Sequence, residues 1–189
     1  MSTQIKPLIP PTFEPITLAE ARMQCRVDTT DEDALLTVYI GAARAMLEHE
    51  CGRRFALQTW RQTLDEFPST GDIEMKVMGP ANSVSQIQYV DAAGTLTTLS
   101  ASAYVLDADT PPAGWVLTAD GVDWPSTKEV ANAVRLDIVC GNCTTIADVP
   151  EDVRAWMLLA VCAMFDKRSS DLPRGFGAAL LDAHRAYAL

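Results

Sequence analysis

Two cysteines separated by two residues are the strongest candidates for chemistry in this sequence. Cys140-Gly-Asn-Cys143 has the spacing of half a zinc site or of a redox-active dithiol. A structural zinc site usually needs a second such pair, and the other cysteines, Cys25, Cys51 and Cys162, are scattered. A thioredoxin-like site needs the pair at the start of a helix, whereas we expect a loop after Cys143. We therefore favour a structural role for both cysteines, with zinc binding and redox function as the alternatives.

Histidine and carboxylate residues give weaker signals for catalysis or metal binding. His49 lies between Glu48 and Glu50, but neighbours in sequence do not share a helical face, which argues against general acid–base catalysis. Asp107 and Asp109 resemble half of a cation-binding loop that lacks the further oxygen ligands. The sequence contains no serine nucleophile motif and no phosphate-binding glycine loop. It therefore predicts a binding or assembly protein, not an enzyme, with no metal or other cofactor.

The charge of the chain argues against sequence-specific binding to nucleic acids. The 189 residues include 15 Lys and Arg against 25 Asp and Glu, a net charge of -10 at pH 7. Most of the excess lies in residues 61–150, where four basic residues face twelve acidic ones. Such a surface repels phosphates. The apolar runs are shorter than the roughly 20 residues of a membrane-spanning helix, and the start of the chain lacks the apolar core of a signal peptide. We therefore expect a protein of a cytosol-like compartment with no membrane partner.

A long amphipathic helix over residues 30–52 is expected to organise the fold. Its apolar residues recur every three or four positions, Thr30 is a suitable N-cap, and Gly52 can end the helix in a left-handed conformation. A capping box, Thr17-Leu-Ala-Glu20, predicts a short helix before it, and Pro150 begins a third, apolar helix. The expected contacts of the long helix join Tyr39, Ile40, Ala43 and Leu47 with Trp156, Leu159, Ala160 and Met164.

Between these helices, hydrophobic and polar residues alternate, which is typical of strands. The candidate strands lie within residues 55–67, 73–77, 84–90, 95–99, 104–107, 114–118 and 134–138. Their regular spacing predicts a compact antiparallel sheet or a small barrel. The expected fold class is α+β, with a helical core, made of the long central helix and the N- and C-terminal helices, and an inserted antiparallel β-rich subdomain. The predicted domains are an extended, Pro-rich N-terminal arm over 1–16, the helical core over 17–54 and 149–189, and the β-rich insertion over 55–148.

Several short motifs occur in a fixed order along the chain. They are Pro15-Ile-Thr-Leu-Ala-Glu-Ala21, Arg26-Val-Asp28, Asp31-Glu-Asp-Ala-Leu-Leu36, Ala42-Ala-Arg44, Cys51-Gly-Arg53, Gln58-Thr-Trp60 and Val149-Pro-Glu-Asp152. Their order and spacing resemble the head–tail connector (adaptor) family of tailed bacteriophages, in its longer members with a β-rich insertion. The resemblance spans residues 15–181, and the CxxC pair is a departure from the family pattern.

The resemblance implies a non-enzymatic structural protein that forms a ring, commonly of twelve copies, beneath the portal at the capsid vertex. Members of the family join the portal protein to the stopper or tail proteins, and genomic DNA passes through the ring without sequence-specific binding. The expected location is the head–tail junction of the virion, and the host cytoplasm during assembly. Two alternatives are a tail-completion or terminator ring protein, and a metal- or thiol-dependent regulatory protein that uses Cys140 and Cys143.

A short apolar segment near the end of the chain is the candidate partner-binding site. Phe176, Leu180, Leu181, Tyr187 and Leu189 present more apolar surface than a helix of about twelve residues readily buries alone. The segment either folds back onto the helical core or, as the resemblance favours, docks on the portal and becomes ordered on binding.

Overall fold

The computed structural model describes residues 3–69, 71–110, 113–167 and 177–185 of the chain. The chain divides into two compact units. The sheet unit comprises Met1–Pro11 and Leu57–Asn142, and the helical unit comprises Thr12–Ala56 and Cys143–Leu189.

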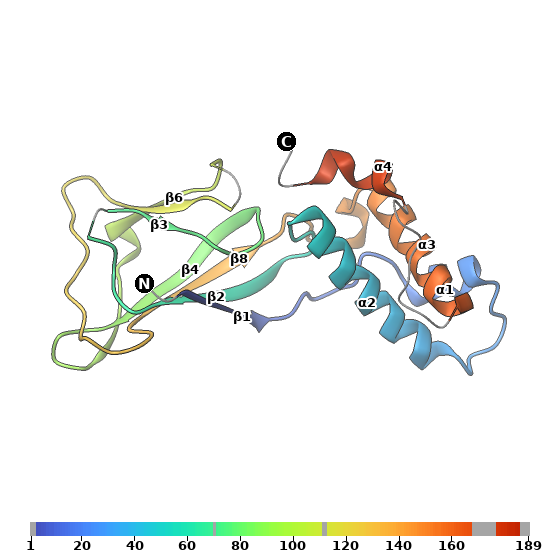
Figure 1. Cartoon of the computed structure of the whole chain (residues 1–189), viewed down its shortest axis with the longest axis horizontal. Coiled ribbons are helices and arrows are strands. Elements are labelled where there is room, and N and C mark those ends of the chain that lie inside the picture. Colours follow the sequence, from blue (N-terminus) through green and yellow to red (C-terminus); the bar gives the residue numbers. More distant parts are fainter. Residues whose placement is uncertain (1–2, 70, 111–112, 168–176, 186–189) are drawn as a thin grey trace. The chain divides into compact units, whose positions relative to one another are not determined.

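Two antiparallel sheets form the sheet unit (Figure 1). The strands are β1 Thr3–Ile9, β2 Gln58–Leu64, β3 Ile73–Glu74, β4 Ala81–Val90, β5 Leu96–Thr98, β6 Tyr104–Asp107, β7 Trp115–Thr118 and β8 Val134–Cys140. The larger sheet has the strand order β1-β2-β8-β4-β5, and the smaller sheet has the order β3-β7-β6. A 3-10 turn, Ala101–Ala103, precedes β6. Each candidate strand from the sequence overlaps an observed strand, although β4 and β8 extend beyond the predicted ranges, and the N-terminal strand β1 is an addition.

The core of the sheet unit lies between the two sheets. Buried side chains of the larger sheet, such as Leu136 and Ile138, belong to one apolar cluster with Ile73 and Val116 of the smaller sheet. Figure 1 shows β3 and β6 together on one side of the larger sheet. The buried Gln62 also joins the sheets, because its Nε2 donates to the Glu74 carbonyl at 2.9 Å and its Oε1 accepts from the backbone N–H of Lys76 at 2.7 Å. A buried amide with both ends bonded avoids the cost of unmet hydrogen bonds.

A charged pair crosses the larger sheet between neighbouring strands. Arg61 of β2 lies opposite Asp137 of β8, and its Nε and Nη2 donate to the two carboxylate oxygens at 2.6 and 2.7 Å. Gln86 of β4 adds a third hydrogen bond to Asp137, at 2.7 Å. Burial by itself raises the pKa of this carboxyl, but the bonds from Arg61 and Gln86 outweigh it and leave the pKa below its ordinary value. The charged form is therefore the one that the fold stabilises.

This pair predicts a loss of stability in acid. A carboxyl whose pKa is lower in the folded than in the unfolded chain stabilises the fold above the unfolded pKa, about 3.9 for Asp. That contribution disappears as the pH falls through the lowered pKa of the folded state. We expect Asp137→Asn to be less stable than wild type at pH 7, and the difference to shrink below about pH 4. Denaturant unfolding at pH 7 and pH 3 measures the difference in stability between wild type and Asp137→Asn. A difference that does not change with pH would contradict a stabilising role for the charged Asp137.

Three α-helices of more than one turn and a short fourth helix form the described part of the helical unit. They are α1 Leu18–Cys25, α2 Asp33–Cys51, α3 Glu151–Lys167 and α4 Ala178–Leu181, with 3-10 turns at Ile146–Asp148 and Asp182–His184. The capping box at the start of α1 is confirmed, since Glu20 N donates to Thr17 Oγ1 at 3.2 Å and Thr17 N donates to Glu20 Oε2 at 2.7 Å. Gly52 ends α2 with φ 64°, as expected.

The predicted N-cap of the long helix is wrong. The helix begins at Asp33, its N-cap residue is Glu32, and the N-cap side chain makes no capping hydrogen bond. The backbone N–H of Asp33 donates to the Thr30 carbonyl at 3.2 Å, so residues 30–33 form a turn before the helix. The carboxylate of Asp33 pairs with Arg22 of α1. A contact between two helices thus fixes the start of α2, and such a contact is not visible in local sequence.

The core of the helical unit has the expected contacts with one exception. Its buried apolar cluster includes Ile40, Ala43, Leu47, Trp156, Ala160 and Met164, and Tyr39 packs on it partly buried. Leu159 was expected in the core, but 41% of it is exposed. It occupies a position on α3 next to the buried stripe, and the edge of that stripe depends on where α1 and α2 lie. Within the described part of the chain, no helix combines the length and apolar character needed to cross a bilayer.

The fold class predicted from the sequence is wrong. A helical core with an inserted β-rich subdomain was expected, but the described chain is rich in sheet, with eight strands in two antiparallel sheets and few helices. The sheets have an apolar core of their own, and they include the start of the chain. Strand patterns indicated the individual strands, but not that they pair into a unit that packs independently of the helices.

The N-terminal segment shows why the sequence misled. Residues 3–9 form β1, which pairs antiparallel with β2 at the edge of the larger sheet (Figure 1). All seven residues are exposed, so no alternation of buried and exposed positions marks the strand. Pro7 lacks an N–H, which an edge strand tolerates because one of its sides forms no ladder. A Pro-rich, exposed strand has the same sequence features as an extended arm.

Candidate functional site

The two cysteines of the CxxC motif are buried and lie in different units. Cys140 ends β8 in the sheet unit, and Cys143 lies in the helical unit, where its backbone N–H donates to the Phe55 carbonyl at 2.9 Å. Burial raises the pKa of the Cys143 thiol, and it also raises the pKa of Cys25 to about 12 and of Cys51 to about 11. Thiols with raised pKa values stay protonated at neutral pH and react slowly. This environment suits packing better than thiolate chemistry.

The other candidate ligands are separated or already engaged. Glu48 is fully buried, whereas the adjacent His49 is exposed. The Asp107 carboxylate accepts hydrogen bonds from the Thr110 hydroxyl at 2.7 Å and from the backbone N–H of Asp109 at 3.0 Å, which lower its pKa. These bonds close a local turn. Among the described residues, no three His, Cys, Asp or Glu side chains are placed to hold a metal ion.

These positions predict that the purified protein contains no stoichiometric zinc. Elemental analysis of protein prepared without chelator should find well under one zinc per chain, because the pair lacks the further ligands of a tetrahedral site. Cys143→Ser should leave the metal content unchanged. About one zinc per chain, lost in that variant, would assign the motif to metal binding instead.

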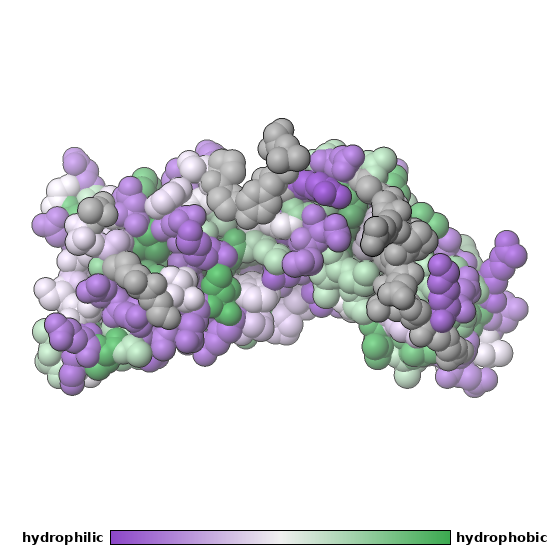
Figure 2. All heavy atoms as spheres, in the orientation of Figure 1, coloured by the Kyte–Doolittle hydropathy of each residue, from purple (hydrophilic) through white to green (hydrophobic). Residues whose placement is uncertain are grey.

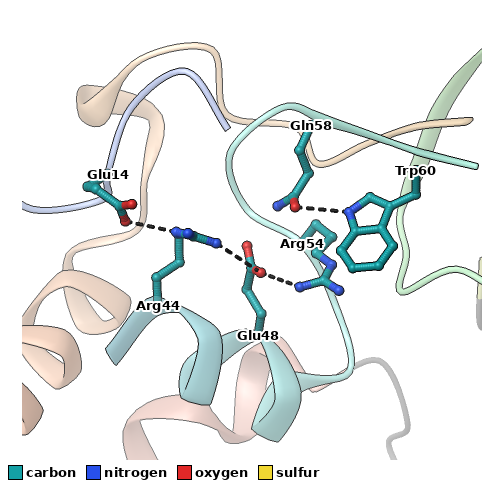
Figure 3. A network of polar contacts seen from close by, with 6 residues as sticks. All are labelled: Glu14, Arg44, Glu48, Arg54, Gln58 and Trp60. Carbon is teal, nitrogen blue, oxygen red and sulfur yellow. Dashed lines mark hydrogen bonds and ion pairs between the residues drawn. The ribbon is translucent and has the colours of Figure 1, made fainter. Parts of the chain in front are cut away.

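A buried ionic network lies in the helical unit and was not anticipated from the sequence (Figure 3). Glu48 of α2 is 0% exposed and pairs with Arg54, and its Oε2 lies 3.5 Å from Nη1 of Arg44. Arg44 also donates through Nε to Glu14 at 2.8 Å. The network links the segment before α1 to the middle and end of α2. A signal was present, because Glu48 is four residues from Arg44 and adjoins the apolar stripe of its helix.

The candidate partner-binding residues are only partly described. Leu181 of α4 is 2% exposed and belongs to the core of the helical unit, and Leu180 packs against that core partly buried. Phe176, Tyr187 and Leu189 lie outside the described residues. Leu181 is therefore an internal residue in this conformation.

Three further contacts hold the described part of this segment to the helical unit. Gly177 has φ 57°, and a Cβ at this position would lie 2.4 Å from Cδ1 of Trp156, so only glycine fits. His184 Nε2 lies 2.8 Å from Oδ2 of Asp152, and the His184 ring meets the edge of Phe55 with ring centroids 6.0 Å apart. The segment is seated by specific side-chain contacts.

The surface offers charged and mixed areas for contact. On the face seen in Figure 2, hydrophilic side chains are spread among hydrophobic ones over each unit. The exposed large apolar residues are distributed over many elements, among them Met23 of α1, Val38 of α2 and Ile9 of β1. Apolar side chains are therefore exposed on both units.

One family model matches part of the chain. The model of the family described as "Phage gp6-like head-tail connector protein" matches residues 15–85. This match confirms the resemblance to head–tail connectors and supports a structural connector role. A search of curated proteins found no match.

Solved structures of similar fold come from phage-like particles. A chain in the virion of a native gene transfer agent particle has a TM-score of 0.77 and 21% identity, with 98% of this chain and 96% of that chain covered. A chain in the neck of the empty particle, computed with C6 symmetry, has a TM-score of 0.77 and 22% identity, with 98% of this chain and 97% of that chain covered. A chain in the neck of the native particle, computed with C12 symmetry, has a TM-score of 0.74 and 22% identity, with 100% of this chain and 97% of that chain covered. The whole fold, with both units, therefore recurs in a virion neck.

Proposed function

We propose that this protein is a structural head–tail connector, or adaptor, of a tailed-phage-like particle. It forms a ring beneath the portal and joins the capsid vertex to the stopper or tail. Genomic DNA passes through the ring. The protein acts at the head–tail junction of the virion, is assembled in the host cytoplasm and catalyses no reaction.

The observation that carries this proposal is the likeness to neck chains over nearly the full length of both chains. The connector family match covers the two N-terminal helices and the first strands after them, and thus draws on both units. Buried thiols and carboxylates bound in local turns are consistent with a role without catalysis.

The same comparison supports ring formation, and the charge of the chain supports DNA passage. The neck structures computed with C6 and C12 symmetry support a ring of identical copies. The net charge of -10 suits a DNA conduit, because a surface that attracted phosphates would bind the DNA and slow its passage.

Binding to the portal of the same particle tests the function. Purified protein should co-sediment with portal rings and appear by electron microscopy as a ring of density on one face of the portal. It should not sediment with tail tubes lacking heads. Binding to the tail tube instead of the portal would assign the chain as a tail-completion or terminator protein. Binding to neither would overturn the proposal.

We further propose that the C-terminal segment contributes to the portal contact. Leu181 and the His184–Asp152 pair hold this segment against the rest of the helical unit. We therefore assign the portal contact to the other apolar residues of the segment, Phe176, Leu180, Tyr187 and Leu189. Deletion after Arg185 removes Tyr187 and Leu189 and keeps the seated part. This truncated protein should keep the unfolding midpoint of wild type and lose portal binding. Deletion after Ser170, which also removes Leu181, should lower the midpoint as well, and full portal binding by both would contradict the assignment.

A further inference from the structure

The outer face of the larger sheet carries a row of polar side chains in register. Lys6 of β1 lies opposite Arg61 of β2, Arg61 lies opposite Asp137 of β8, and Asp137 lies opposite Gln86 of β4. Residues opposite each other in a sheet project from the same face. Arg135, two residues before Asp137, adds a second cation to this face. The other face of the sheet is apolar and covered by the smaller sheet.

This outer face is positive in a negative unit. Its ionic side chains are three cations, Lys6, Arg61 and Arg135, and one carboxylate, which gives +2. The Asp137 carboxylate is buried, and Arg61 and Gln86 bind its oxygens. Lys6 and Arg135 have no ion pair among the described residues, and both line a hollow of about 330 Å³ together with Gln4 and Thr63. Two unpaired cations thus lie beside a concave area of polar side chains.

The opposite side of the sheet unit is acidic. The smaller sheet and its adjoining loops, residues 72–76 and 104–123, contain one basic and six acidic residues, a net charge of -5. The single basic residue, Lys76, is paired with Glu74. Asp109, Asp120 and Asp123 are exposed. The unit therefore has charges of opposite sign on its two outer sides.

We propose that these two sides meet between neighbouring copies of this chain. The basic outer face of the larger sheet in one copy binds the acidic side of the smaller sheet in the next copy. This inference rests on the proposed ring. A closed head-to-tail ring needs two different, complementary patches on each subunit, and opposite sides of one unit meet this need. Identical subunits of charge -10 repel one another, so a patch of opposite sign is required for approach and register.

A basic face could also bind DNA, but the observations favour the acidic side of a second copy as its partner. Affinity for duplex DNA grows with the number of phosphates that Lys and Arg neutralise. The face offers two cations, Lys6 and Arg135, that form no ion pair within the described part of the chain, and the remainder of the unit is acidic. A small basic area suits a few carboxylates on a protein loop better than a long row of phosphates.

Exchange of charge between the two sides tests the proposal. The first variant, Lys6→Glu with Arg135→Glu, reverses the basic face, and the second, Asp109→Lys with Asp120→Lys and Asp123→Lys, changes the charge of the acidic side from -5 to +1. In either variant like charges meet, so the protein concentration that fills the ring on the portal should rise about tenfold or more. The variant with all five substitutions again places opposite charges against each other, and it should recover most of the loss.

Matched controls reverse exposed charges of the same unit that belong neither to the polar row nor to residues 72–76 and 104–123, in Lys128→Glu and Glu66→Lys. These variants should fill the ring as wild type does. Thermal unfolding of each variant checks the fold, and Lys6→Glu alone, at an exposed strand position, is the variant least able to disturb it. Ring filling by both charge-reversed variants at the wild-type concentration would overturn the proposal. Loss of binding to a short DNA duplex in the first variant, with normal ring filling, would overturn it in favour of DNA.

A second measurement separates this inference from the proposed function. Sedimentation velocity at high protein concentration and low salt detects self-association without a portal. Wild type and the five-substitution variant should self-associate, the charge-reversed variants should not, and added salt should weaken the association. If wild type fails to bind portal but shows this pattern, the proposed function fails and the inference stands. Equal self-association by all variants would overturn the inference alone.

Discussion

Replacing Trp156 by alanine is expected to lower the free energy of unfolding by about 3–5 kcal/mol. The side chain of Trp156 is 3% exposed and lies in the core of the helical unit, where it packs against Gly177 at the start of α4. Truncation removes the apolar surface that this indole buries and leaves a cavity between α3 and its neighbours. Denaturant unfolding followed by circular dichroism at the helical wavelength measures the change without depending on tryptophan fluorescence.

Leu159→Ala on the same helix is the matched control. Leu159 is 41% exposed, so its truncation should cost less than about 1 kcal/mol. Equal losses in the two variants would mean that α3 turns a different face to the core. An unchanged midpoint for Trp156→Ala would contradict the packing described above.

Replacing Glu48 by alanine is expected to lower the free energy of unfolding by about 3 kcal/mol. Glu48 is fully buried, and its removal leaves Arg54 and Arg44 without the carboxylate that they share. The loss should fall at the lower end of the range for buried pairs, because both arginines are partly exposed and can turn toward water. Denaturant unfolding of the helical unit gives the value.

Glu50→Ala, two residues away on the exposed side of α2, is the control and should stay within about 0.5 kcal/mol of wild type. Glu48→Gln keeps the shape of the side chain and one acceptor oxygen. Its free energy of unfolding should lie between those of Glu48→Ala and Glu50→Ala. A Glu48→Ala protein as stable as wild type would show that water replaces the carboxylate, and that the network does not fix the end of α2.

Portal binding and ring closure depend on different parts of the chain in the proposals above. The C-terminal segment belongs to the helical unit, whereas the oppositely charged sides belong to the sheet unit. A truncation that abolishes portal binding should therefore leave self-association intact, and charge reversal in the sheets should leave the first contact with the portal intact. This separation allows the two proposals to fail independently.

Features that depend on a few neighbouring residues were predictable from the sequence. The capping box of Thr17 and Glu20 closes within four residues, and Gly52 ends α2 because glycine alone adopts φ 64° without cost. Strand β6 has the predicted bounds, because alternation and flanking turn residues define it locally. The connector family was also accessible, since it depends on the order of short motifs.

Features that depend on distant residues were not predictable. β1 is a strand only because β2 lies beside it, and its exposed, Pro-containing sequence has no periodic signal of its own. Glu48 is buried because Arg44 and Arg54 neutralise it, so a charged residue occupies a core position. Leu159 is exposed because the width of the buried stripe on α3 is set by the helices that pack on it.

The candidate surfaces likewise combine properties set by local sequence with properties set by contacts between distant residues. The sequence by itself determined the acidity of the chain, the start of α1, the end of α2 and most strands, because these are properties of composition and of local spacing. Tertiary structure decided that Leu181 is internal and that Lys6 joins Arg61 and Arg135 on one sheet face, although about 55 and 129 positions separate them along the chain. Pairing between strands placed these cations together, since the strand that follows another in sequence need not be its neighbour in the sheet.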